Sequence, residues 1–121
     1  MKYIVIEEHK NDNLTPIIVT KGTRVKLGER SDINGSWPNW IYCYSLDGQG
    51  EGWTPIQIIQ IENEYGVVIE DYSAVELDVK KGETVVGDIE LNGWVWCTKF
   101  IGLDTGWLPK EKLKIIPISN E

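Results

Sequence analysis

The sequence has few of the residues that commonly build metal or redox sites. Its 121 residues include two cysteines and one histidine. Cys43 and Cys97 are too few and too far apart for a disulfide framework, and only His9 is available to join them as a metal ligand. We therefore expect reduced, buried cysteines, no metal site and no cofactor.

Long apolar runs are also missing. The chain reaches two acids, Glu7 and Glu8, before any apolar run is long enough for a signal-peptide core, and no stretch approaches a membrane span. The formal net charge of −7 repels phosphate backbones and anionic surfaces. We expect a cytoplasmic, soluble protein with no nucleic-acid or membrane partner. The charge suits a basic partner, and it equally suits solubility alone.

Residue sets that point to an enzyme are absent as well. The adjacent acids at residues 7–8 and 70–71 resemble a general acid and base, but neighbouring residues on a strand point to opposite faces and cannot converge on one bond. No Ser-His-Asp set and no phosphate-binding glycine loop can be assembled from the other residues. We expect a protein that is not an enzyme.

The sequence does contain an internal repeat. Trp-Ile-Tyr-Cys at residues 40–43 is echoed by Trp-Val-Trp-Cys at 94–97, and both this block and the next one recur at an offset of 54 residues. Two upstream blocks recur at offsets of 60 and 63 residues. In chain order, the four matched pairs are residues 6–9 with 69–72, 19–25 with 79–85, 40–43 with 94–97, and 52–55 with 106–109.

The repeated blocks predict an all-β fold. They are short runs rich in Val, Ile, Trp and Tyr, and Lys-Gly, Asp-Gly and Asn-Gly pairs between them suit tight turns. No amphipathic helix of useful length is present. We predict two small β-barrels in tandem, an N-terminal domain at residues 1–62 and a C-terminal domain at 63–121. The very short junction at residues 62–64 should leave little freedom between them.

Alternation within the tryptophan blocks assigns residues to faces. Cys43 and Cys97 share one face with Ile41 and Val95, which predicts that this face is the core. The opposite face should point outward and carry Trp40, Tyr42, Trp94 and Trp96. Cover of these aromatics by the neighbouring domain is the alternative. Pro55 and Pro109 should each end a strand, followed by a single turn and a last short strand, because proline cannot donate to a ladder.

The second copy resembles a Src-homology-3 domain along nearly its whole length. Val-Ile-Glu-Asp-Tyr at residues 68–72 is similar to the family's opening Ala-Leu-Tyr-Asp-Tyr, and residues 76–83 resemble its acidic loop and diverging turn. Gly-Trp-Val-Trp at 93–96 and Gly-Trp-Leu-Pro at 106–109 resemble its tryptophan strand and its closing Gly-Tyr-Ile-Pro. The first copy resembles the family more loosely. The whole chain resembles the tandem bacterial members of this family.

The resemblance implies a peptide-binding groove. In the family, an aromatic groove takes proline-rich peptides, and an acid in the first long loop pairs with an Arg or Lys of the peptide. Carried over, the implied ligand-binding residues are Tyr72, Glu76, Trp94, Trp107 and Pro109 in the second copy, and His9, Trp40, Trp53 and Pro55 in the first.

Four positions depart from the family pattern. Glu70 and Lys112 replace the first and last groove tyrosines of the second copy. In the first copy Glu7 again stands at the first tyrosine position, and Pro16 stands where the acid belongs. The first copy therefore lacks its charged anchor, and the second copy is the one expected to bind.

Three functions follow from these patterns. The first is a peptide-binding adaptor, whose second copy engages a basic or proline-containing segment of a protein partner. The second is a peptidoglycan-binding module of the bacterial cell wall, which the acidic charge disfavours. The third is a structural or homodimerising protein whose aromatic faces pack together. The sequence leaves the ligand and the oligomeric state open.

Overall fold

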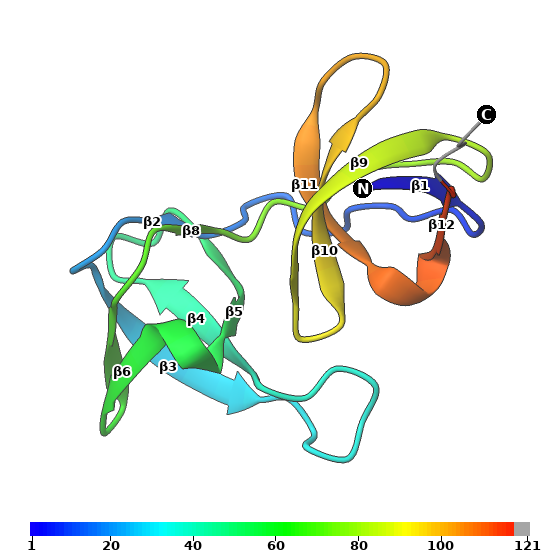
Figure 1. Ribbon diagram of the computed structural model, residues 1–121. Helices are drawn as coiled ribbons and strands as arrows, with labels where there is room; N and C mark the ends of the chain where they lie inside the picture. Colours follow the sequence, from blue (N-terminus) through cyan, green and yellow to red (C-terminus); the bar gives the residue numbers. More distant parts are fainter. Residues whose placement is uncertain (118–121) are drawn as a thin grey trace. The chain divides into compact units, whose positions relative to one another are not determined.

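The computed structural model describes residues 1–117, and these residues form twelve short strands and two single 3-10 turns (Figure 1). The predicted all-β fold is confirmed. Contacts divide the chain into two compact units, which we call unit 1 and unit 2. Unit 1 combines Met1–Asp12 with the chain from Glu76 onward, and unit 2 is Asn13–Val75. Within the described residues, no helix is long and apolar enough to cross a membrane.

Unit 2 contains a five-stranded antiparallel sheet in the order β5-β4-β3-β7-β6. β2 and β8 form a separate two-stranded antiparallel sheet. The elements of unit 2 are β2 (Ile18–Val19), β3 (Arg24–Arg30), β4 (Trp40–Ser45), β5 (Glu51–Pro55), the 3-10 turn η1 (Ile56–Ile58), β6 (Ile59–Glu62), β7 (Tyr65–Val68) and β8 (Tyr72–Ser73).

Unit 1 contains a matching sheet in the order β11-β10-β9-β1-β12. Its elements are β1 (Lys2–Val5), β9 (Thr84–Leu91), β10 (Trp94–Lys99), β11 (Thr105–Pro109), the 3-10 turn η2 (Lys110–Lys112) and β12 (Leu113–Ile115). Among the residues that the structure describes, no ladder joins the two edge strands of either sheet, so backbone hydrogen bonds do not close either sheet into the predicted barrel.

Each sheet is completed by a strand from the other repeat. In unit 1, β1 of the first repeat lies between β9 and β12. In unit 2, β7 of the second repeat lies between β3 and β6. The registers are equivalent, because Tyr3 faces Val85 across the ladder just as Gly66 faces Val25. The first strands of the two repeats are therefore exchanged.

The exchange changes the division of the chain from the one that the sequence predicted. The expected junction at residues 62–64 is the turn of a hairpin inside unit 2, where Glu62 pairs with Tyr65 and Asn63 adopts a positive φ of 61°. The chain passes between the units after Asp12 and after Val75. The units are thus not residues 1–62 and 63–121. The physical reason is that β6, the last strand of the first repeat, turns back to pair with β7 instead of leading to a second domain.

Local predictions for the strand ends agree with the structure. β5 and β11 end at Pro55 and Pro109, and each is followed by a single 3-10 turn and a short strand. Between β9 and β10 the chain turns in two residues, where Asn92 and Gly93 have φ values of 50° and 87°. Positive φ at both positions is the pattern of a type I′ hairpin turn.

Each unit has its own apolar core, drawn from both repeats. Tyr3 and Val5 of the first repeat join the core of unit 1, whereas Val68 and Ala74 of the second repeat join that of unit 2. The inward face was correctly assigned, since Cys43 and Cys97 are fully buried. The outward face was only partly correct: Trp40 is buried, while the other three aromatics of that face are partly accessible.

Burial of the two thiols leads to a prediction. Burial raises the pKa of Cys97 from its ordinary value of 9.0 to about 12, and it raises the pKa of Cys43 although a hydrogen bond with Thr54 lowers it. At pH 8 a thiol reagent should label the native protein slowly and the urea-unfolded protein fully. Fast labelling of the native protein would show that these thiols are not core groups.

The same shift predicts how stability depends on pH. The unfolded chain loses the Cys97 proton near pH 9, whereas the folded chain keeps it until about pH 12. The folded state therefore binds more protons in this window, and the free energy of unfolding should fall as the pH rises from 9 towards 12. Urea midpoints measured from pH 7 to 11 test this, with Cys97→Ala as the control that should flatten part of the decline.

Candidate binding site

The exchange of strands redistributes the predicted ligand-binding residues. His9 is in unit 1, where it joins Glu76, Trp94, Trp107 and Pro109. Tyr72 is in unit 2, with Trp40, Trp53 and Pro55. The sequence had placed His9 and Tyr72 each with the other set. The correction has a physical cause, because both residues follow the first strand of their repeat and travel with it into the other sheet.

Backbone hydrogen bonds position the two main residues of the unit 1 site. His9 and Val79 form an antiparallel bridge, with reciprocal N–H to C=O bonds of 3.0 and 2.9 Å. Glu76 forms a parallel bridge with Trp107 of β11. His9 is therefore held against Val79, and Glu76 is held against β11. The side chains of His9 and Glu76 meet as a result.

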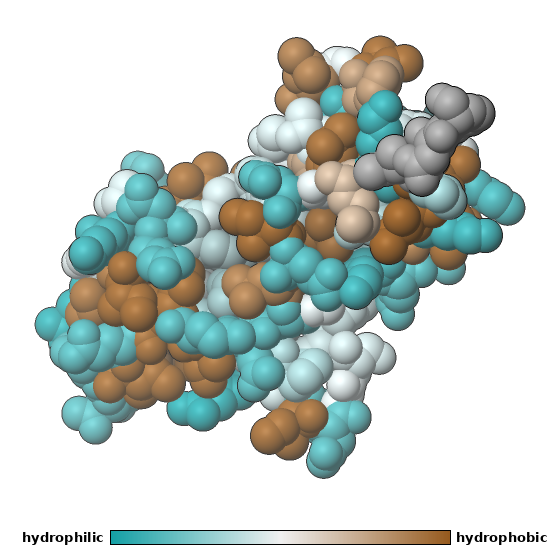
Figure 2. Space-filling view, in the orientation of Figure 1, coloured by the Kyte–Doolittle hydropathy of each residue, from teal (hydrophilic) through white to brown (hydrophobic). Residues whose placement is uncertain are grey.

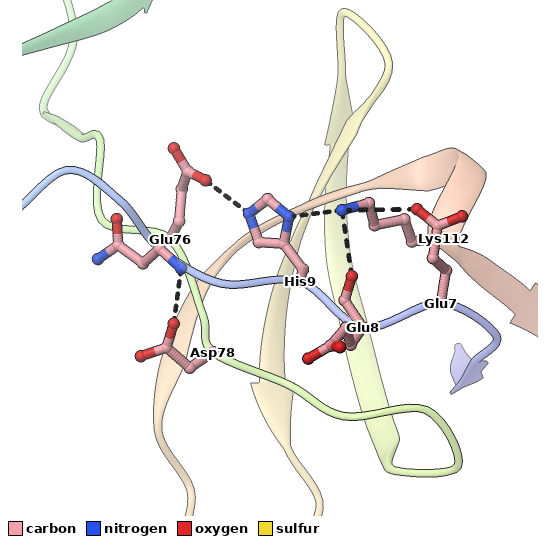
Figure 3. Close-up of polar contacts among 7 residues, drawn as sticks. Glu7, Glu8, His9, Glu76, Asp78 and Lys112 are labelled. Carbon is pink, nitrogen blue, oxygen red and sulfur yellow. Dashed lines mark hydrogen bonds and ion pairs between the residues drawn. The ribbon is translucent and has the colours of Figure 1, made fainter.

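His9 lies between an acid and a base (Figure 3). Its Nε2 is 2.6 Å from Oε1 of Glu76, and its Nδ1 is 3.1 Å from Nζ of Lys112. A lysine ammonium group has donors and no acceptor, so Nδ1 must accept and Nε2 must carry the proton. In this arrangement its Nε2–H donates to the Glu76 carboxylate.

The Lys112 ammonium group has three polar contacts. Besides its hydrogen bond to Nδ1 of His9, it donates to the carbonyl oxygen of Glu8 at 3.2 Å and forms an ion pair with the carboxylate of Glu7 at 3.7 Å. Lys112 stands where the family pattern has a tyrosine. An aromatic side chain is therefore replaced here by a cation, which donates a hydrogen bond to His9.

Trp94 completes the site in unit 1. Its ring meets the His9 ring edge-on, with centroids 5.7 Å apart and an interplanar angle of 81°. Trp94 is partly buried, so part of a large aromatic side chain remains accessible beside the His9 ring. Asp78 accepts the backbone N–H of Asn11 at 2.6 Å close by and, like Glu7 and Glu8, it is exposed. The accessible side of this site is therefore mainly acidic.

The other predicted residues of unit 1 are structural in part. Pro109 is fully buried, and Trp107 is only 7% exposed with its ring edge-on to Trp96 at 5.3 Å. Glu90 of β9 forms an ion pair with Lys110 at 3.0 Å. Both partners of that pair are about half exposed, so it contributes little stability. Trp94 and Glu76 are thus the accessible part of the predicted set.

The predicted residues of unit 2 form a different surface. Trp40 and Pro55 are buried, whereas Trp53 is 41% exposed and contacts the Tyr42 ring at 5.2 Å. Tyr72 donates its hydroxyl to the carbonyl oxygen of Trp53 at 2.9 Å. The residues here that were not in the predicted ligand-binding set are Tyr42, Tyr44 and Glu51, which are linked by ring contact and by a 2.7 Å hydrogen bond.

The most exposed apolar side chains lie outside both predicted sets. Phe100, Ile101 and Leu103 are exposed in the connection between β10 and β11, where hydrophobic surface shows at the top of Figure 2. Nζ of Lys2 lies 4.8 Å from the centre of the Phe100 ring. The candidate site is thus distinguished by the pairing of an aromatic ring with acids and not by apolar surface alone.

An all-β unit that presents an aromatic residue beside an acid fits the SH3-like class of domain. A family model for the variant SH3 domain matches residues 2–62, which is half of the 121-residue chain. The chain belongs to the variant SH3 domain family. Comparisons with characterised proteins and with solved structures gave no significant match. Family membership identifies a binding module in general terms, and such domains are typically non-catalytic.

The Lys112 contacts lead to a prediction. Lys112→Met removes the donor to Nδ1 of His9, and leaving a partly buried acceptor without its partner should cost about 1 kcal/mol of stability. Lys114→Met is the matched control, because Lys114 is an exposed residue of β12 and its loss should change stability little. Urea unfolding compares the two variants. Equal midpoints would show that the His9 contact has no structural weight.

Proposed function

We propose that this protein is a non-enzymatic binding protein whose unit 1 recognises a basic, proline-containing peptide segment. The single observation that carries the proposal is that the His9 ring contacts both the Glu76 carboxylate and the Trp94 ring. A partly accessible indole suits the flat surface of a polyproline-type peptide, and a nearby carboxylate suits an Arg or Lys of the same peptide.

The charges around the site support a basic ligand. Glu7, Glu8 and Asp78 are exposed on the segments that hold His9 and Glu76. Such acids raise the encounter rate of a cationic peptide and suppress the binding of anionic ones. Lys112 is the opposing charge, but its ammonium group is directed at His9, Glu8 and Glu7.

Unit 1 is a better candidate than unit 2 for a physical reason. In unit 2 the tryptophan equivalent to Trp94 is Trp40, which is only 5% exposed. The position of the acid is occupied by Pro16, whose backbone bridges to Glu51. Unit 2 therefore lacks both the accessible ring and the matching carboxylate at these positions, so recognition through them is proposed for unit 1.

Peptide titration tests the proposal. The probe is a fluorescein-labelled ten-residue peptide with two prolines three residues apart and one flanking arginine, and its twin carries glutamate in place of the arginine. We expect the full chain to bind the first peptide and not the second. Trp94→Ala should weaken binding by about 2 kcal/mol, or roughly thirtyfold, as loss of an aromatic hot spot does.

The acid is tested by salt dependence. Glu76→Gln should weaken binding and flatten its dependence on salt, because the interaction between exposed charges is screened. Trp53→Ala is the matched control, since Trp53 is an accessible tryptophan of unit 2. If Trp94→Ala and Glu76→Gln bind the peptide like the wild type, the site is not the one proposed. Co-sedimentation with peptidoglycan in place of peptide binding would favour the cell-wall alternative.

A further inference from the structure

The two sheets each contain a slot for a first strand, between the second and the last strand of the unit. In unit 1 this slot lies between β9 and β12 and holds β1, and in unit 2 it lies between β3 and β6 and holds β7. The family model matches residues 2–62 as one continuous stretch. A contiguous arrangement, in which each repeat keeps its own first strand, is therefore the natural competitor of the exchanged one.

Backbone hydrogen bonding does not favour one of the two arrangements over the other. The repeats have equivalent registers, with Ile4 opposite Thr84 in unit 1 and Val67 opposite Arg24 in unit 2. Either first strand could make the same ladder in either slot, since ladder hydrogen bonds are the same for every non-proline residue. The choice has to come from side chains, and the strands differ most where Tyr3 in β1 corresponds to Gly66 in β7.

In unit 1 a small residue makes room for the tyrosine. A Cβ atom on Gly87 would lie 2.4 Å from Cε2 of Tyr3 and 2.9 Å from Cγ1 of Val95. Real Cβ atoms do not approach side chains so closely. The Tyr3 ring therefore fills the space that Gly87 leaves empty, and Tyr3 is buried in the core of unit 1.

In unit 2 the sizes are reversed. The residue of β3 that corresponds to Gly87 is Leu27, at the offset of 60 residues that relates the two strands. Leu27 packs against the core of unit 2, and a Cβ atom on Gly66 would lie 3.1 Å from Cδ2 of Leu27 and 2.5 Å from Cγ2 of Ile59. Gly66 must therefore be a glycine, because Leu27 and Ile59 already fill the space that a side chain would need.

We propose that two pairs of opposite size, Tyr3 with Gly87 and Gly66 with Leu27, make the chain exchange its first strands between the repeats. With β1 in the slot of unit 2, the Tyr3 ring would collide with Leu27 and Ile59. With β7 in the slot of unit 1, Gly66 would place no side chain against Gly87 and would leave a cavity of the size of a tyrosine ring. Overpacking and cavities are both destabilising, so the contiguous arrangement is disfavoured in both units.

Cysteine cross-linking on the full chain reports the arrangement. Ile4→Cys combined with Thr84→Cys places two thiols on directly paired residues in the exchanged form, and Ile4→Cys combined with Arg24→Cys does so in the contiguous form. We expect a short bifunctional thiol reagent to link 4 with 84 within one chain, more than about tenfold in excess of 4 with 24, since core misfits cost more than one factor of ten. Predominant linking of 4 with 24, or a covalent dimer, would overturn the proposal.

Swapping the two sizes tests the cause. The double variant Tyr3→Gly, Gly66→Tyr mismatches both slots of the exchanged form, so it should lower the urea midpoint or move the cross-link from 4–84 to 4–24. Adding Leu27→Gly and Gly87→Leu restores opposite sizes in the exchanged form and should recover the 4–84 cross-link and part of the midpoint. A double variant that keeps both wild-type properties, or a quadruple variant no more stable than the double one, would overturn it. Tyr3→Phe, which keeps the ring, is the control expected to behave like the wild type.

Discussion

The fold depends on the insertion of the first strand of one repeat between two strands of the other repeat. The inserted strand pairs with both and joins them in one sheet. In the part of the chain that the structure describes, β1 joins β9 to β12 in unit 1, and β7 joins β3 to β6 in unit 2. Each inserted strand satisfies backbone groups on both sides and also adds residues such as Val5 and Val68 to the core. Removing either strand would therefore expose two strand edges and open the core at once.

This insertion also creates the candidate site. His9 follows β1 and reaches Glu76 because β1 belongs to the sheet of unit 1. Had each repeat kept its own first strand, Glu76 would face Tyr72 at this position, and Lys112 would have no imidazole to donate to. The placement of His9 between Glu76 and Lys112 is thus a product of the fold, and the proposed recognition of a basic peptide depends on the exchange of strands.

The connectivity has a simple physical basis. In each sheet the first and last strands are antiparallel neighbours, as Val68 with Ile59 and Val5 with Leu113 show. Neighbouring antiparallel strands can be joined by a short hairpin, as β6 and β7 are. Unit 2 can therefore be one continuous stretch in which β7, which takes the place of a first strand, follows β6 in the chain. Such a unit fits into a loop of unit 1 because loops tolerate insertions that leave the core intact.

Local chemistry let the sequence determine much of this protein by itself. It determined the all-β class, the strand ends at Pro55 and Pro109, and the inward face of Cys43 and Cys97, because proline geometry and side-chain alternation act within a few residues. It did not determine which sheet receives which first strand, or that Trp40 is buried while Trp53 is accessible. Two similar repeats offer the same hydrogen bonds to either strand. Only the tertiary structure decided between them, through the sizes of side chains that meet across strands far apart in the sequence.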